Sequence, residues 1–224
     1  MSITRAAAIV LAKELRLEFR SRELLTTTLV FVLMVIVLFS FSFDPTSEES
    51  RKIGPGLLWI AFLFAGSLML NPSFAREQAN DTLYALRLAP VEPFAILLGK
   101  ILANLAFLLL TELLLLPVFA VLYNVALLPV LGRMVLVLLL GTLGMAVTGT
   151  AFSAISAQAR MRELLLPLLL LPVLTPVLIA SVECTAGLFA DPAELRMNWL
   201  NVLVAFDIIF LAGSYLLCDT LLEE

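Results

Sequence analysis

Histidine is absent from this sequence of 224 residues, and charged residues are scarce, at 14%. Without histidine the chain cannot supply an imidazole base, a histidine zinc ligand or an axial haem histidine. Its two cysteines, Cys184 and Cys218, fit no metal-binding or disulfide spacing, and we expect both to be small apolar residues of the spans. A net charge of −4 and the lack of a basic block argue against a nucleic-acid partner.

Apolar residues are abundant instead. They make up 62% of the chain, and the mean hydropathy is +1.07. Soluble domains have about 45–50% apolar and about 25% charged residues. Here the apolar residues are grouped in blocks of about 20, the length of helix that crosses a bilayer. The composition therefore predicts an all-α polytopic membrane protein.

Six apolar runs qualify as transmembrane helices, and they leave room only for a single transmembrane domain over residues 1–224. The predicted spans are residues 24–43, 53–74, 94–123, 128–155, 164–182 and 199–222. Three prolines, Pro167, Pro172 and Pro176, are expected to kink the fifth span because each removes a backbone donor. Residues 184–198 are expected to form either a plain outer loop or a re-entrant segment.

The distribution of basic residues predicts the orientation. Ten of the 14 fall on the side of the N-terminus: Arg5, Lys13, Arg16, Arg20, Arg22, Arg76, Arg87, Lys100, Arg160 and Arg162. The other side has Arg51, Lys52, Arg133 and Arg196. Because cytoplasmic loops carry the excess of Lys and Arg, both termini are predicted to be cytoplasmic.

Residues 5–22 precede the first span and have the pattern of an amphipathic helix. Ala8, Leu11, Ala12, Leu15 and Phe19 form an apolar stripe, and Lys13, Arg16 and Arg20 form a basic one. Such a helix can lie in the cytoplasmic interface against anionic lipid. It can also act only as a basic flank that sets the topology, or meet a cytoplasmic partner.

Residues 76–93 separate the second and third spans on the cytoplasmic side. In a short helix here, Ala79, Leu83 and Leu86 would share one face and Pro90 would end it. So small a segment has no core of its own. Its apolar face must rest on lipid, on neighbouring spans or on another protein.

Several polar residues fall inside the predicted spans, and four of them are candidates for polar contacts within the membrane. Lys100, Asn104 and Glu112 share one face of the third span, and Asp207 lies in the sixth. Ionisable residues at this depth usually face protein or water. Lys100 can also extend to the interface, whereas Glu112 must pair with a polar group or carry a proton.

Small residues recur along one face of the fourth span, which permits close packing of helices. They are Thr142, Ala146, Gly149, Ser153 and Ala157. A dimer interface is only one use of such a face.

Four stretches, taken in order, resemble the CcmB family, the permease-like subunit of bacterial cytochrome c maturation. The stretches are "KELRLEFRSRE", "IGPGLLWIAFLFAGSLMLNPSFARE", "LLGKILANLAFLLLTELLLLPVFAVLYN" and "LGTLGMAVTGTAFSAISAQARMRELLLPLLLLPVLTPVLIASVECT". The resemblance runs from about Lys13 to Thr185. It implies a half-transporter of the ABC-2 type in the bacterial inner membrane.

The resemblance also implies partners. They are a CcmA-like ATP-binding subunit, a CcmC-like haem-handling membrane protein, a small CcmD-like subunit and a CcmE-like haem chaperone. ATP would be bound by the first of these and haem handled by the complex, with release of the loaded chaperone or haem export as the outcome. A homodimer would follow the usual ABC arrangement. No cofactor is assigned to this chain itself.

The resemblance implies a non-catalytic membrane subunit. The chain has no G-x-x-x-x-G-K-[ST] motif for ATP binding, so ATP hydrolysis is expected in a partner chain. The alternatives are an ABC-2 permease for a lipid, drug or glycan, a scaffold subunit that does not move, and an intramembrane enzyme.

By analogy with ABC-2 exporters, residues 76–93 would carry a coupling helix that contacts the ATPase. The contact residues would be Arg76, Glu77, Asp81, Leu83, Leu86, Arg87 and Leu88, with Arg160, Arg162 and Glu163 from the next cytoplasmic loop. Pro72 and Tyr84 depart from the family pattern, in which we expect a basic and an acidic residue respectively. Glu183 is assigned to the outer mouth.

Overall fold

The computed structural model describes residues 2–42, 48–74, 91–156 and 162–223, and every regular element within these ranges is a helix. The elements are α1 (Ile3–Ser21), α2 (Glu23–Ser42), α3 (Glu48–Leu70), α6 (Pro93–Leu122), η1 (Leu128–Val130), α7 (Leu131–Ser156), α8 (Arg162–Phe189) and α9 (Met197–Glu223). Six helices of this described part are long and apolar enough to cross a membrane. The prediction of an all-α polytopic membrane protein is confirmed.

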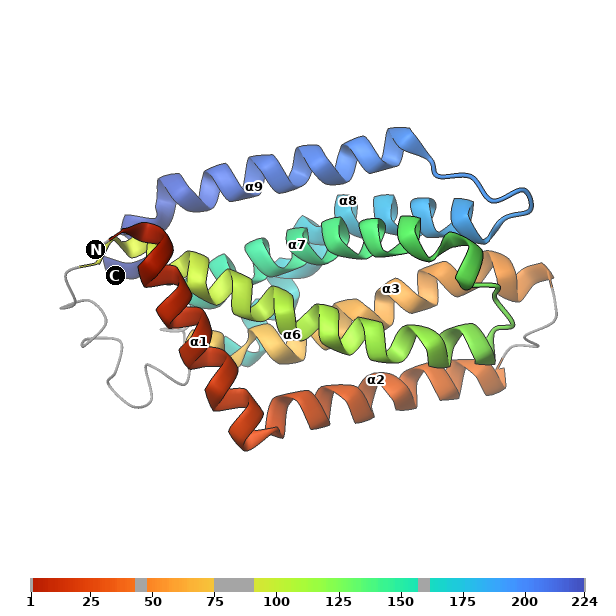
Figure 1. Ribbon diagram of the computed structural model, residues 1–224, viewed down its shortest axis with the longest axis horizontal. Helices are drawn as coiled ribbons and strands as arrows, with labels where there is room; N and C mark the ends of the chain where they lie inside the picture. Colours follow the sequence, from red (N-terminus) through yellow and green to blue (C-terminus); the bar gives the residue numbers. More distant parts are fainter. Residues whose placement is uncertain (1, 43–47, 75–90, 157–161, 224) are drawn as a thin grey trace.

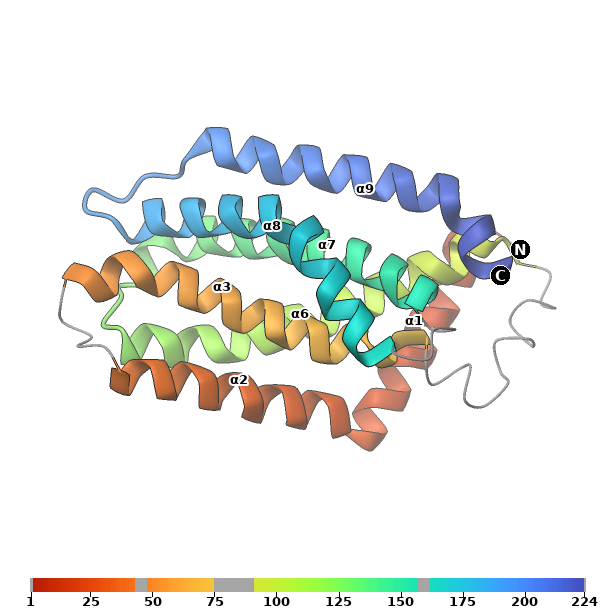
Figure 2. The same cartoon turned by 180° about the vertical axis from the view of Figure 1, so that it is seen from behind.

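The six long helices lie side by side, and α1 crosses one end of them at a steep angle (Figure 1). Both chain termini lie at that end, which we call the termini end; the opposite end is the far end. The charge bias predicts that the termini end is cytoplasmic. Helices α2 and α9 lie at opposite edges of the bundle, with α3, α6, α7 and α8 between them (Figures 1 and 2).

The two edge helices expose large apolar side chains. On α2 these include Val30, Met34 and Leu38, and on α9 Ile208 and Leu216. In water such faces would be a liability, since soluble monomers rarely expose large apolar patches. They suit the hydrocarbon of a bilayer.

Helix α7 is central and packs against α3, α6, α8 and α9. A Cβ atom on Gly141 would lie 2.4 Å from Cη2 of Trp59 in α3, and one on Gly149 would lie 2.3 Å from Cδ1 of Leu70. The Ser153 hydroxyl donates to the carbonyl of Asn71, 3.5 Å away. The small residues of α7 therefore make close contacts within this chain; Ala157 lies outside the described residues.

Helix α8 contains its three prolines without ending at any of them. Figure 2 shows that its direction changes along its length, as the loss of backbone donors predicts. The helix continues past residue 182 to Phe189, so the first part of the stretch 184–198 is helical. Thr185 is accommodated there because its hydroxyl donates to the Ser181 carbonyl (2.8 Å) and accepts from Trp59 Nε1 (2.9 Å).

The connection from α8 to α9 folds back on the end of α8. The amide of Glu194 donates to the carbonyl of Gly187 over 2.9 Å. A Cβ atom on Gly187 would lie 2.4 Å from the Glu194 carbonyl oxygen, so a glycine is needed for this close approach. The connection from α8 to α9 is therefore attached to the end of α8.

Candidate functional site

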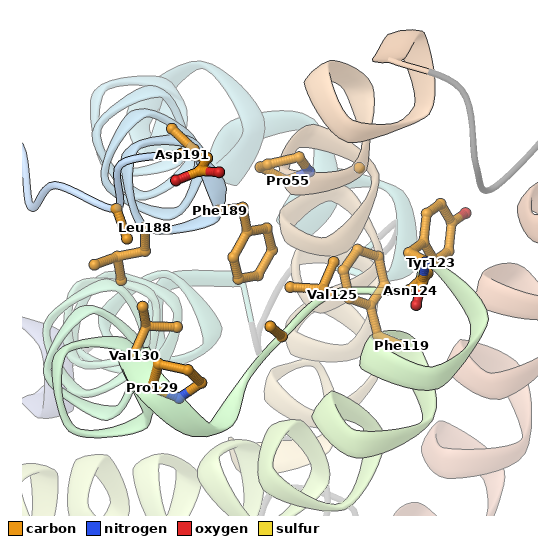
Figure 3. Close-up of a pocket in the computed structure, with 14 residues that line it drawn as sticks. Pro55, Phe119, Tyr123, Asn124, Val125, Pro129, Val130, Leu188, Phe189 and Asp191 are labelled. Carbon is orange, nitrogen blue, oxygen red and sulfur yellow. The ribbon is translucent and has the colours of Figure 1, made fainter.

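The far end of the bundle contains a cavity of about 310 Å³. It lies between the start of α3, the connection from α6 to α7, and the end of α8 (Figure 3). Aromatic rings form one wall: the Phe119 ring stacks on Tyr123 with centroids 4.3 Å apart and faces Phe189 at 6.3 Å. Asn124 and Asp191 supply the polar lining.

Glu183, the residue predicted for the outer mouth, lies near this end but does not line the cavity. Its carboxylate accepts a hydrogen bond from Arg196, which is on the connection to α9. The pair fastens the connection to α8 in addition to the Gly187 contact.

At the termini end, α1 lies directly on the backbone of α6. A Cβ atom on Gly99 would be 2.6 Å from Cβ of Val10 and 2.8 Å from the carbonyl oxygen of Ala7. Ala6, Ala7 and Val10 are buried, whereas Phe19 of the predicted apolar stripe is 54% exposed. Of the predicted stripe, Leu11 and Leu15 are partly buried and pack against the hydrophobic core, whereas Ala8 is exposed. The face of α1 that rests on α6 is therefore displaced from the predicted stripe.

The end of α1 is joined rigidly to α2. Arg22, between the two helices, has a left-handed backbone with φ of 55°, and its amide donates to the Glu18 carbonyl. The buried Glu18 carboxylate accepts from the amide of Leu25 over 3.0 Å and so caps the first turn of α2. These two hydrogen bonds of Glu18 therefore connect the end of α1 to the start of α2.

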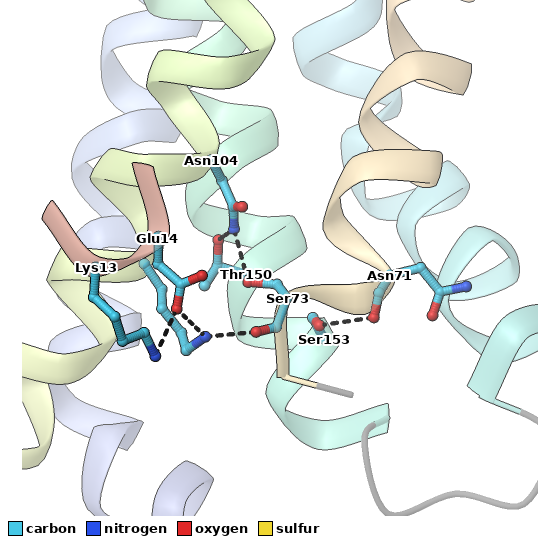
Figure 4. Close-up of polar contacts among 8 residues, drawn as sticks. Lys13, Glu14, Asn71, Ser73, Asn104, Thr150 and Ser153 are labelled. Carbon is cyan, nitrogen blue, oxygen red and sulfur yellow. Dashed lines mark hydrogen bonds and ion pairs between the residues drawn. The ribbon is translucent and has the colours of Figure 1, made fainter. Parts of the chain in front are cut away.

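Lys100 connects three parts of the chain. Its partners Glu14 and Ser73 are labelled in Figure 4. Its ammonium is 3.0 Å from Oε1 of Glu14 in α1 and donates to the carbonyl of Ser73 over 2.5 Å. It also lies 4.6 Å from the centre of the Phe74 ring, within range of a cation–π interaction. Only 1% of the side chain is exposed. The lysine does not extend to an open surface but is enclosed by α1 and the end of the second span.

Asn104, one turn further along α6, extends the same network. Its side-chain amide donates to the Ser73 hydroxyl (3.1 Å) and to the hydroxyl of Thr150 in α7 (2.9 Å). Thr150 in turn donates to the carbonyl of Ala146 over 2.6 Å. We call Glu14, Ser73, Lys100, Asn104 and Thr150 the anchor network. It joins α1, residues 71–74, α6 and α7.

The charge of Glu14 is stabilised within this network. Burial raises the pKa of its carboxyl, but the nearby ammonium groups of Lys100 and Lys13 lower the pKa by more than burial raises it. The pKa of Glu14 is therefore below its ordinary value of 4.5. Lys13 lies 3.0 Å from the same carboxylate oxygen. At neutral pH Glu14 is therefore ionised, and the buried Lys100 has a charged partner.

Glu112 lies outside the anchor network, although it shares a helix face with Lys100. One carboxylate oxygen, Oε2, accepts from the Thr142 hydroxyl of α7 over 2.6 Å. The other, Oε1, has no hydrogen-bond partner among the described residues. Glu112 thus makes a polar contact between α6 and α7 inside the bundle.

Asp207 is buried where α9 meets α7. A Cβ atom on Gly144 would lie 2.9 Å from its Oδ1 and 3.2 Å from Val177 of α8. Within the described part of the chain neither carboxylate oxygen has a hydrogen-bond partner. The absence of a side chain on Gly144 makes the space for this carboxylate.

The residues predicted to contact an ATPase are not placed by the structure. Those at positions 76–88 and Arg160 lie outside the described residues. Arg162 and Glu163 belong to the first turn of α8, and only their backbone is described. The anchor network nevertheless includes Ser73, three residues before Arg76 in the chain.

Several members of the anchor network were not found from the sequence. Glu14 was missed because it is an ordinary residue of an amphipathic helix, and Ser73 because it is a common residue at the end of a span. The unusual feature was Lys100, a lysine early in an apolar run, which calls for an anion nearby. Glu14, in a basic amphipathic helix on the same side of the membrane, is the anion that meets this need.

The described residues contain no group of three or more His, Cys, Asp or Glu side chains that could hold a metal ion. Cys184 and Cys218 are both buried and are not joined by a disulfide. The buried polar side chains of the anchor network connect α1, residues 71–74, α6 and α7 through hydrogen bonds and an ion pair. We therefore take the anchor network as the candidate functional site.

Comparison with known proteins gives consistent matches. A family model described as CcmB protein matches residues 5–216. Heme exporter protein B of Pseudomonas aeruginosa is 36% identical over 200 residues, which cover 88% of this chain and 89% of that protein. Heme exporter protein B of Rhodobacter capsulatus is 34% identical over 183 residues, or 78% and 79% of the two chains. The protein of that name in Escherichia coli strain K12 is 34% identical over 91 residues, 41% of each chain.

The family match includes α1, the anchor network and nearly all of the six long helices. The alignment with the Pseudomonas protein covers most of both chains, so the likeness is not confined to one apolar segment. This chain is a multi-pass protein of the bacterial inner membrane, and it belongs to the CcmB family.

Proposed function

We propose that this chain is the permease subunit of an ABC-type complex for cytochrome c maturation. In this role it couples ATP hydrolysis by a separate subunit to haem delivery or to release of a haem-loaded chaperone. The observation that carries the proposal is the 36% identity to a heme exporter protein B over 88% of the chain. Haem is then cargo of the complex, and ATP is bound by the partner.

The sequence supports the division of labour. It contains no G-x-x-x-x-G-K-[ST] motif, whose glycine-rich backbone and lysine would hold the phosphates of ATP. The chain must therefore receive the energy of hydrolysis through contact with another protein. Its proposed partners are CcmA-like, CcmC-like, CcmD-like and CcmE-like proteins, and two copies of the chain are proposed to pair.

Residues 76–93 are the proposed contact with the ATPase subunit, together with Arg160, Arg162 and Glu163. Ser73 and Phe74, which lead into this segment, are held by Lys100 and Asn104. A force applied to the segment is thus received by residues with firm attachments to the bundle. This placement supports the proposal that the segment transmits motion.

The test is co-expression of the chain with the ATP-binding subunit and the haem-handling partners. Leu83→Asp and Leu86→Asp place a charge on the proposed apolar contact face, and we expect each to reduce co-purification of the ATPase subunit at least tenfold. Cytochrome c formation should fall with it. Charge reversal at Asp81 and Arg87 tests the polar part of the contact.

Ala85→Asp is the matched control, because Ala85 lies between Leu83 and Leu86 in sequence but is about 160° and about 100° away from them around a helix. It should leave assembly and cytochrome c formation near the wild-type level. If the Leu83 and Leu86 variants assemble and mature cytochrome c as the wild type does, residues 76–93 are not the contact.

A further inference from the structure

We infer that Lys100 is a positioning residue that makes α1 and the end of the second span a single mechanical unit, so that α1 follows any movement of residues 71–74. The inference extends the proposed function, since it rests on residues 76–93 as the ATPase contact. It assigns to α1 a part in transmission beyond that of a lipid-surface helix.

The geometry gives the reason. The Lys100 ammonium contacts Glu14 of α1 at 3.0 Å and the Ser73 carbonyl at 2.5 Å, and no third element separates them. With 1% of its side chain exposed, it has little access to water that could replace either contact. A buried cation that loses its partner is costly, so Glu14 and Ser73 cannot separate easily while Lys100 is charged.

Two other contacts of α1 connect it to α6 and to α2, and would pass a movement of α1 to these helices. Gly99, beside Lys100, lets the α1 backbone rest on α6, and Glu18 caps α2 at the end of α1. A displacement of residues 71–74 is therefore passed through Glu14 to α1, and through the Glu18 joint to the first span. Without Lys100, α1 would still touch α6 through Val10, but within the described part of the chain it would lose its polar link to residue 73.

The informative variant is Lys100→Met, which keeps the length of the side chain and removes the ammonium. Glu14→Gln is a milder second variant, because the amide oxygen can still accept from Lys100. Lys52→Met is the control: it is the same substitution at an exposed position on α3, outside the anchor network. Each variant is prepared both as the full chain alone and in the full complex, embedded in lipid nanodiscs.

Two measurements read the link. Spin labels at Leu17→Cys on α1 and Leu128→Cys at the far end report the position of α1; both sites are exposed, and the native cysteines are buried. First, in the chain alone, Lys100→Met should broaden the distribution of label distances relative to wild type and Lys52→Met. Second, in the complex, ATP with vanadate should shift the distance in wild type and Lys52→Met.

In Lys100→Met we expect that shift to be lost and cytochrome c formation to fall at least tenfold, while the ATPase subunit still co-purifies. Glu14→Gln should show an intermediate loss. A Lys100→Met chain with the wild-type distance distribution, or a complex with the wild-type ATP-dependent shift, overturns the inference. Failure of the wild-type chain to bind an ATPase subunit would instead refute the proposed function, and the measurement on the chain alone would still decide whether Lys100 links the two elements.

Discussion

Replacement of Gly99 by alanine tests the contact of α1 with α6 most directly. The added Cβ atom would lie 2.6 Å from Cβ of Val10 and 2.8 Å from the carbonyl oxygen of Ala7. The carbonyl and the Cβ atom are fixed by the α1 backbone, so no rotation of a side chain relieves these contacts. The two helices must move apart.

The magnitude follows from a comparison of two glycines. Overpacking of this kind costs about 1–3 kcal/mol. Alanine also favours a helix over glycine by about 0.8–1.0 kcal/mol, which acts in the opposite direction. Gly213 in α9 has no heavy atom within 4 Å of an added Cβ. Gly213→Ala should therefore change the stability only through the higher helix propensity of alanine. The difference between the variants should therefore be about 1–3 kcal/mol.

Unfolding of both variants by SDS in mixed micelles measures this difference. A second assay follows cleavage by trypsin after Arg16 and Arg20, which becomes faster when α1 leaves the bundle. If Gly99→Ala is as stable as Gly213→Ala and equally resistant to trypsin, then α1 is not packed on α6 as the structure places it.

Three further predictions concern buried polar groups. Burial raises the pKa of Glu14, but Lys100 and Lys13 lower it by more, so the pKa in the folded chain is below 4.5. The ion pairs of Glu14 therefore stabilise the fold above pH 4.5, and this stabilisation is lost as the pH falls through the lowered pKa. The unfolding midpoints of wild type and Glu14→Gln should differ at neutral pH and converge below pH 4.5. Glu112→Gln keeps an acceptor for Thr142 and should be within about 1 kcal/mol of wild type in SDS unfolding, whereas Glu112→Ala should cost about 1–3 kcal/mol. Trp59→Phe removes the donor to the Thr185 hydroxyl, so a loss of about 1–3 kcal/mol is expected, smaller in a Thr185→Val background.

The sequence predicts the spans well because the bilayer imposes one length on each of them. The boundaries of α2, α6 and α7 agree with the predicted runs to within one or two residues at most ends. At α8 the prediction stops at residue 182, seven residues before the helix ends. Glu183 and Thr185 are polar, and the sequence does not tell that Arg196 and Trp59 satisfy them.

The partner of a buried charge is harder to predict than the charge itself. Lys100 and Glu112 stand out in an apolar run, but Glu14 is an ordinary residue of an amphipathic helix. Periodicity identifies an apolar face of α1 without telling whether it meets lipid or protein. Whether this face meets protein depends on Gly99, which is 85 positions beyond Glu14 in the chain. The absence of a side chain at Gly99 lets the backbones of α1 and α6 approach closely.

The anchor network also determines how far a local movement must spread. Asn104 joins the Ser73 hydroxyl to Thr150, and Thr150 belongs to α7, which contacts α3, α6, α8 and α9. Residues 71–74 cannot move relative to α6 without breaking the Lys100 contact, or relative to α7 without breaking the contact through Asn104. Since unpaired polar groups are costly in a buried site, the favourable path is a joint movement of α1, α6 and α7. Any force that enters the chain at residue 74 is thereby divided between the interface helix on one side and the centre of the bundle on the other.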